Sequence, residues 1–302
     1  MNARSNAPEI LLLGSESGFS FHALKALLDL RLPVAEVLVA AGDGDASRRP
    51  VMRGSLPLLQ PGSLADLAAR EGISVISCRS TREDWAFELA REMAPELILV
   101  ACLPERLDQR WRELCRGACF NLHPSLLPAY RGPAPLFWQL RDGLSRVGIT
   151  VHRVESTVDA GALLAQEEIG VGDDDNLATL NAALAATGVR LFARSLEACL
   201  AGTATLVPQD EAKASYRPWP KAEDFTLDTR WPAARAFRFV RATQSLGTPY
   251  RVEVEGAAYL IDRVVALDLG AAGDEAISEA GGVLTIRFAD GVLKGVGKRR
   301  DA

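Results

Sequence analysis

The sequence has few histidines and few cysteines, which limits the kinds of site it can build. Among 302 residues there are three histidines and five cysteines. Cys115 and Cys119 are spaced as a pair, but no second pair completes a structural zinc site. We therefore expect no bound metal, and we expect the cysteines to be reduced, buried thiols of the kind found in cytosolic proteins.

Long apolar runs and an excess of positive charge are also missing. No stretch approaches the ~18 consecutive apolar residues of a membrane-spanning helix. The polar segment from Met1 to Glu9 lacks the apolar centre of a signal peptide. We therefore predict a cytoplasmic protein with no membrane partner. The net charge is −5, whereas proteins that coat nucleic acid are usually basic, so any nucleic-acid partner must meet a local patch.

The glycine motifs of common nucleotide-binding folds are absent as well. Gly14 and Gly18 follow an apolar run, but they form neither G-x-G-x-x-G nor G-x-x-x-x-G-K-[ST]. A tight turn after a strand explains this pair better. The sequence therefore disfavours a dehydrogenase or a nucleoside triphosphatase.

The chain does contain a regular alternation of strand-like and helix-like segments up to about residue 200. Short apolar runs at 9–14, 33–41 and 95–101 are separated by segments with helical spacing. Such alternation is typical of βαβ units around a parallel sheet. We therefore predict an α/β fold with a doubly wound, mostly parallel sheet of the Rossmann-like type.

The pattern changes near Pro208. Two prolines and two aromatic residues make an extended connector at 216–220, and a helical segment follows at 231–243. Alternating, strand-like segments separated by glycines occupy the rest of the chain, which is typical of a small β domain such as an open barrel. We predict two domains, residues 1–207 and 208–302.

Polar and apolar residues alternate at Phe120-Asn-Leu-His123. In a strand, Asn121 and His123 point to the same face. The prolines that follow end the strand, and open α/β sheets place their chemistry at the carboxyl ends of strands. An Asn amide can donate to a developing oxyanion, and a His can donate or move a proton. Capping of a turn by this pair explains the spacing equally well.

A second polar segment carries Asp159-x-Gly161. It follows a strand-like run at 149–154 and precedes another apolar run. Asp159 sits at the turn before that second run, which makes it a candidate functional residue. An ordinary Asx-turn is the alternative for Asp159.

Together these segments resemble the folate-dependent formyltransferase superfamily. The resemblance rests on Asn121-x-His123-Pro-Ser-Leu-Leu-Pro128, then Val147-Gly-Ile-Thr-Val-His-x-Val154, then Asp159-x-Gly161, in the order and at the spacing of the family. Segments at 221–231, 239–242 and 288–293 are similar to the C-terminal open barrel of methionyl-tRNA formyltransferases, the most similar branch. Glycinamide ribonucleotide formyltransferase and formyltetrahydrofolate hydrolase, two other members, lack that domain.

The resemblance implies an enzyme that moves a formyl group from 10-formyltetrahydrofolate to an amine. Asn121, His123 and Asp159 match the catalytic trio of the family. Asn121 and His123 would donate hydrogen bonds to the oxyanion, and Asp159 would orient His123. The implied folate site is formed by two segments, and its residues are Leu103, Pro104, Glu105, Arg106, Leu107, Val154 and Val158.

The sequence leaves the formyl acceptor open. Residues 213–251 contain eight Lys or Arg against three Asp or Glu, a local excess that could contact the phosphates of an initiator methionyl-tRNA. We name Arg48, Arg235 and Arg238 as candidate acceptor-binding residues. A small amine such as a nucleotide-linked amino sugar is the alternative, because the loop at 42–53 is less basic than its counterpart in the tRNA enzymes. Two further alternatives are hydrolysis of the donor and folate binding without turnover.

Overall fold

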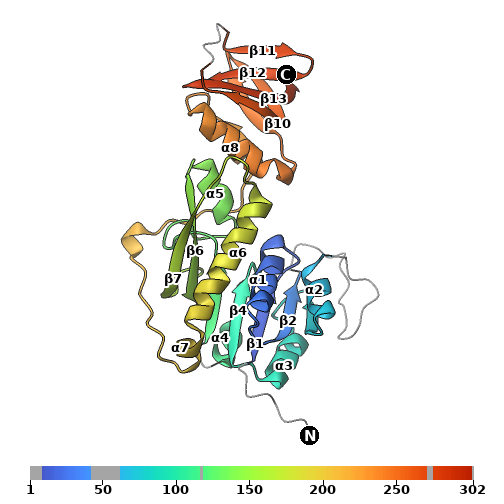
Figure 1. Ribbon diagram of the computed structural model, residues 1–302, viewed down its shortest axis with the longest axis vertical. Helices are drawn as coiled ribbons and strands as arrows, with labels where there is room; N and C mark the ends of the chain where they lie inside the picture. The colour runs from blue at the N-terminus through green and yellow to red at the C-terminus, as the bar shows by residue number, and fades with distance from the viewer. Residues whose placement is uncertain (1–8, 42–61, 116–117, 271–274, 301–302) are drawn as a thin grey trace. The chain divides into compact units, whose positions relative to one another are not determined.

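The computed structural model describes residues 9–41, 62–115, 118–270 and 275–300. The chain divides into two compact units (Figure 1). The first unit comprises Met1–Pro133, Gly148–Ile169 and Asn181–Tyr216, and the second comprises Ala134–Val147, Gly170–Leu180 and Arg217–Ala302. The chain thus passes between the units several times, and a single domain boundary after residue 207 remains a prediction.

A seven-stranded sheet carries the N-terminal part of the chain, with strand order β3-β2-β1-β4-β5-β6-β7. The first five strands pair in parallel, and β6 runs antiparallel to β5. The predicted α/β fold with a mostly parallel sheet is confirmed. The strands are β1 (Ile10–Gly14), β2 (Val34–Ala40), β3 (Ser74–Cys78), β4 (Leu97–Ala101), β5 (Cys119–His123), β6 (Arg146–Arg153) and β7 (Leu163–Gly170).

Side-chain caps begin several of the helices that connect these strands. Ser17 accepts a hydrogen bond from the Ser20 amide at the start of α1, and Ser63 and Asp108 do the same for α2 and α4. The helices in this part of the chain are α1 (Gly18–Asp29), α2 (Leu64–Arg70), α3 (Asp84–Met93), α4 (Gln109–Leu114), α5 (Pro135–Arg141), α6 (Leu177–Arg194) and α7 (Leu196–Leu200).

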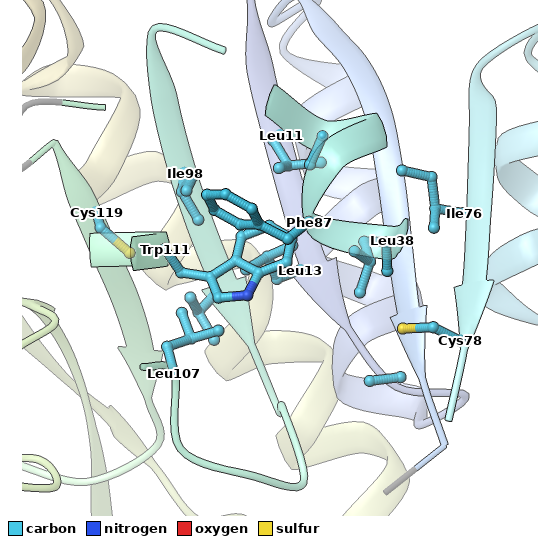
Figure 2. Close-up of a cluster of buried hydrophobic side chains, with 14 of the residues drawn as sticks. Leu11, Leu13, Leu38, Ile76, Cys78, Phe87, Ile98, Leu107, Trp111 and Cys119 are labelled. Carbon is cyan, nitrogen blue, oxygen red and sulfur yellow. The ribbon is translucent and has the colours of Figure 1, made fainter. Parts of the chain in front are cut away.

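One face of the sheet packs on α3 and α4 through a cluster of buried apolar side chains (Figure 2). Leu11 and Leu13 project from β1 into this cluster because alternate strand residues share a face. At its centre the rings of Phe87 and Trp111 meet edge to face, with centroids 5.2 Å apart. The Trp111 indole donates a 2.8 Å hydrogen bond to the Thr81 carbonyl, which fixes the loop that follows β3.

The second unit contains a six-stranded sheet with order β11-β12-β13-β10-β9-β8. Among the described residues, β8 and β9 pair in parallel and the other neighbouring strands pair antiparallel, so the expected C-terminal β architecture is confirmed. The helix α8 (Ala233–Thr243) buries Phe239, whose ring lies 5.6 Å from that of Tyr250. The strands are β8 (Thr226–Leu227), β9 (Tyr250–Val254), β10 (Ala257–Asp268), β11 (Ile277–Ala280), β12 (Val283–Phe288) and β13 (Gly291–Arg299), and three short 3-10 turns are η1 (Glu211–Lys213), η2 (Ala222–Phe225) and η3 (Gln244–Leu246).

The cysteines are all free thiols, and four of the five are buried. The exception is Cys102, which is exposed, so the expectation that all thiols are buried is wrong at this position, where the chain bends away from the end of β4. Burial raises the pKa of the Cys78 thiol to about 12. Within the ranges that the structure describes, no helix has the length and apolar character needed to cross a membrane, and no three potential ligand side chains are grouped for a metal.

The buried Trp111 provides a test of this packing. Trp111→Ala should lower the free energy of unfolding by about 3–5 kcal/mol, because it leaves a large cavity. Trp111→Phe should cost about 1–3 kcal/mol, because the Thr81 carbonyl loses its donor. Urea denaturation followed by circular dichroism measures both. Trp85→Ala is the matched control, since Trp85 on α3 is 41% exposed; a comparable loss in that variant would contradict the assignment.

Candidate active site

The antiparallel pairing of β5 with β6 places two polar side chains opposite each other. Asn121 of β5 is the register partner of His152 of β6. The Asn121 amide nitrogen lies 3.0 Å from Nε2 of His152. Asn121 is therefore held from the neighbouring strand, and one proton of its amide remains available for another acceptor.

His152 accepts this hydrogen bond because its other nitrogen is already committed. Its Nδ1 lies 2.8 Å from the Arg153 carbonyl, to which it donates, so Nε2 carries the lone pair in the neutral ring. Burial, and next the proximity of His123, lower the pKa of His152 to about 4, although Asp159 acts in the opposite direction. His152 is therefore neutral near pH 7 and keeps the Asn121 amide nitrogen in place.

His123 lies at the carboxyl end of β5 and is 4% exposed. Its Nε2 is 3.0 Å from the Tyr130 carbonyl oxygen, and its Nδ1 is 3.5 Å from Oδ1 of Asp159. Both ring nitrogens thus face oxygen acceptors, and the distance on the Asp159 side is longer than an ordinary hydrogen bond. The structure brings together all three residues of the predicted trio.

Asp159 reaches His123 from the bend that follows β6. Its Oδ2 accepts a 2.9 Å hydrogen bond from the Gly132 amide, and its backbone is left-handed, with φ of 54°. The glycine two residues later has a steric reason, because a Cβ at Gly161 would lie 1.9 Å from the Arg153 carbonyl oxygen. The Asp-x-Gly spacing therefore combines a carboxylate that faces His123 with the close turn that aims it.

The loop between β5 and α5 is fixed by hydrogen bonds to Thr150 of β6. The Thr150 hydroxyl donates to the Ser125 carbonyl at 2.6 Å and accepts from the Leu127 amide at 3.1 Å. Gln166 of β7 donates to the Leu127 carbonyl and to the same hydroxyl. These bonds hold the chain as it turns from His123 towards Tyr130.

The residues expected to bind folate have different environments. Leu107 is buried in the core cluster, and Leu103 and Val154 pack against it. The Glu105 carboxylate bonds to the loop after β3, where it accepts hydrogen bonds from the Ser80 hydroxyl at 2.6 Å and from the Thr81 amide at 2.5 Å. Pro104 and Arg106 are exposed and Val158 is half-buried. Folate contacts by these seven residues remain a prediction.

The three arginines expected at the acceptor site also differ. Arg48 lies outside the described residues. Arg235 donates twice to the Arg141 carbonyl, at 3.1 and 2.7 Å, and its guanidinium lies 3.9 Å from the centroid of the Trp231 ring. Arg238 is half-buried on α8. The guanidinium of Arg235 is thus engaged at the carboxyl end of α5, and acceptor binding by all three remains a prediction.

A surface hollow near the amino ends of β4 and β5 is a competing location for a ligand. It is lined by residues that include Arg91, Glu96 and Arg153. None of Asn121, His123 and Asp159 lines it. The cluster formed by these three side chains therefore lies outside this hollow.

Three contributors to the site were missed from the sequence. These are His152 as the partner of Asn121, the Tyr130 carbonyl, and Gln209, which donates to the backbone of Asp159. The first has a sequence signal, since polar residues at 121 and 152 interrupt two apolar runs. A backbone carbonyl and a residue 50 positions from its partner give no periodic signal.

Comparison with known proteins finds relatives of this chain. The formyl transferase family model matches residues 46–196. A methionyl-tRNA formyltransferase of Kosmotoga olearia is 34% identical over 61% of this chain and 59% of its own length, which is less than two thirds of that relative. One of Levilactobacillus brevis is 31% identical over 86% of this chain and 79% of its own.

A solved structure shows the same fold. The N-formyltransferase of Helicobacter canadensis, in complex with folinic acid and dTDP-3-aminofucose, superposes with a TM-score of 0.63 over 97% of this chain and 100% of its own, at 15% identity. The family model spans half of the sequence, and the L. brevis relative matches over most of both chains. The chain therefore belongs to the formyl transferase family of enzymes.

Proposed function

We propose that this protein transfers the formyl group of 10-formyltetrahydrofolate to an amine, and that Asn121, His123 and Asp159 perform the transfer. The observation that carries the proposal is the convergence of an amide donor, an imidazole and a carboxylate at the carboxyl end of β5, with His123 Nδ1 3.5 Å from Asp159. Together, an amide, an imidazole and a carboxylate can stabilise an oxyanion and move a proton.

In the net reaction, one proton moves from the amine nitrogen to N10 of the folate. The amine nitrogen attacks the formyl carbon, a carbon–nitrogen bond forms, and the carbonyl oxygen becomes an oxyanion. The bond from that carbon to N10 of the folate then breaks, N10 gains a proton, and the amine nitrogen loses one. The products are the formylated amine and tetrahydrofolate.

The geometry suggests how the side chains divide this work. Asn121 uses one amide proton on His152, so its second proton is free to stabilise the oxyanion. His123 donates from Nε2 to the Tyr130 carbonyl, so Nδ1 is the nitrogen that exchanges the substrate proton. Asp159 stabilises the imidazolium that forms when Nδ1 accepts a proton. The Nδ1–H of that imidazolium can hydrogen-bond to the oxyanion, and it transfers its proton to N10 when the bond from the carbon to N10 breaks, which returns His123 to its neutral form.

The choice of a folate donor rests on the family and on the expected folate segments. The Helicobacter canadensis enzyme of the same fold holds folinic acid. In this chain, residues 103–107 follow β4, and residues 154–158 follow β6 and lead into Asp159. A pterin bound between them would bring the formyl group on N10 of the same folate towards Asn121.

For the acceptor we propose a methionyl-tRNA. Two relatives that match this chain carry the name methionyl-tRNA formyltransferase, and the basic segment 213–251 supplies positive charge for phosphates. A nucleotide-linked amino sugar is the second candidate. It is favoured by the Helicobacter canadensis structure, which holds dTDP-3-aminofucose, and by the hydrogen bonds that engage the Arg235 guanidinium with the Arg141 carbonyl.

His123 provides the first test of the chemistry. His123→Ala should lower kcat for formyl transfer by about 10²–10⁴, because proton transfer through Nδ1 is lost. His123→Asn keeps a polar side chain of similar size and separates this loss from a packing defect. Steady-state kinetics and a thermal melt measure both effects, and His22→Ala on α1 serves as the control. A folded His123 variant with near-normal kcat would contradict the assignment.

The donor site can be tested without turnover. Calorimetric titration with 5-formyltetrahydrofolate should give a single binding site, and 10-formyltetrahydrofolate should compete for it. Titration with ATP should give no displacement of the folate, because the sequence lacks the glycine motifs that bind a triphosphate. Binding of ATP in place of folate would contradict the proposed donor.

The acceptor can be identified by the salt dependence of binding. With methionyl-tRNA, log affinity should fall by about 0.9 per log unit of salt for each phosphate neutralised. Arg238→Glu should weaken tRNA binding by about tenfold, because a cation on α8 becomes an anion. Lys25→Glu makes the same change of charge on α1 and should have little effect. A salt-independent KM, with transfer to an amino-sugar nucleotide instead, would favour the second candidate.

A further inference from the structure

Both oxygen acceptors of His123 belong to residues in an unfavourable backbone conformation. Tyr130, which offers its carbonyl, has φ of 59°, and Asp159, which offers its carboxylate, has φ of 54°. Left-handed backbone at residues other than glycine costs free energy and persists where surrounding contacts enforce it. The groups that enforce these two conformations therefore control the position of both acceptors.

Gln209 holds the Asp159 bend. Its amide nitrogen donates to the carbonyls of Asp159, at 2.7 Å, and Gly161, at 2.8 Å. One side chain thus bridges two carbonyls of the Asp-x-Gly turn. Gln209 lies in the segment beyond α7, so this bridge joins the turn to a part of the chain outside β5 and β6.

Arg131 fixes the direction in which the Gln209 amide points. Its guanidinium donates to Oε1 of Gln209 at 2.7 Å from one nitrogen and 3.2 Å from another. The same guanidinium forms a two-pronged ion pair with Glu211, at 2.9 and 2.6 Å. Arg131 is 8% exposed, so this pairing is largely shielded from water on the arginine side. With Oε1 occupied in this way, the amide nitrogen of Gln209 must face the Asp159 turn.

Ser215 holds the other acceptor. Its hydroxyl accepts from the Tyr130 amide at 2.9 Å, and its carbonyl accepts from the Arg131 amide at 2.8 Å. The Ser215 amide donates to the Pro128 carbonyl at 3.1 Å. The peptide groups on both sides of Tyr130 are therefore bonded to the same residue.

We propose that residues 209–215 form a positioning strap that sets both acceptors of His123, with Gln209 as the positioning residue for Asp159. The proposal rests on the proposed function, since it assigns the strap a part in formyl transfer. Gln209 acts through Asp159 and does not meet the reacting atoms. Its loss should therefore lower kcat and leave the affinity for the folate unchanged.

A double-mutant cycle between Gln209 and Asp159 tests this coupling. Gln209→Ala alone should lower kcat by about 10- to 100-fold, because misplacing a catalytic group by about 1 Å has effects of that size. In an Asp159→Asn background the same change should lower kcat by less than about twofold, since the group it positions has lost its charge.

Gln209→Glu separates positioning from general stability. A glutamate at 209 still accepts from Arg131, but its carboxylate cannot donate to the Asp159 and Gly161 carbonyls. We expect a loss of kcat similar to that of Gln209→Ala, with an unchanged dissociation constant for 5-formyltetrahydrofolate and a melting temperature close to that of the wild type. Gln109→Ala is the matched control, since Gln109 on α4 bonds only to Glu113 among its described neighbours.

The outcomes separate this inference from the proposed function. Wild-type protein that transfers no formyl group to any acceptor overturns both. Active wild-type protein with additive effects in the cycle, or with normal kcat in Gln209→Glu, overturns the strap alone. A Gln209 variant that weakens folate binding as much as it lowers kcat overturns it too, because the loss would then reflect a damaged pocket. Coupled losses confined to kcat support it.

Discussion

The register between β5 and β6 is the constraint on which the rest of the site depends. It places Asn121 opposite His152, and it puts His123 at the end of β5, where the chain leaves the sheet for the Tyr130 loop. A shift of one residue would turn Asn121 and His123 to the other face of the sheet, because side chains alternate along a strand. Phe120 and Leu122, the buried apolar neighbours of Asn121, oppose that shift.

The sequence predicts the fold well for physical reasons that can be named. Short apolar runs that alternate with segments of helical spacing are local signals, and this alternation predicts the parallel sheet. Asn121, His123 and Asp159 could be found because they are polar residues within or beside such runs. The Tyr130 carbonyl and Gln209 could not be found this way, since a main-chain oxygen has no sequence identity and a single glutamine in a polar segment has no pattern.

The chemical type of a side chain does not show whether that side chain is available to bind a ligand, because it can already be bonded within the protein. From the sequence, Arg235 is a candidate to bind the phosphates of an acceptor, and Glu105 is a candidate to line the folate site. In the structure Arg235 bonds to the end of α5 and stacks on Trp231, and Glu105 joins the loops after β3 and β4. Long charged side chains find backbone partners many residues away, and these pairings become visible only in three dimensions.

The position of the strap along the chain has a consequence for how the protein is made. All seven strands of the first sheet have been synthesised by residue 170, yet the bonds that hold Asp159 and Tyr130 come from residues 209–215. Because chains fold from the N-terminus during synthesis, the sheet can form while its bends at Tyr130 and Asp159 are still unsupported. The nascent chain can thus form its sheet before residues 209–215 are available to hold the two bends that face His123.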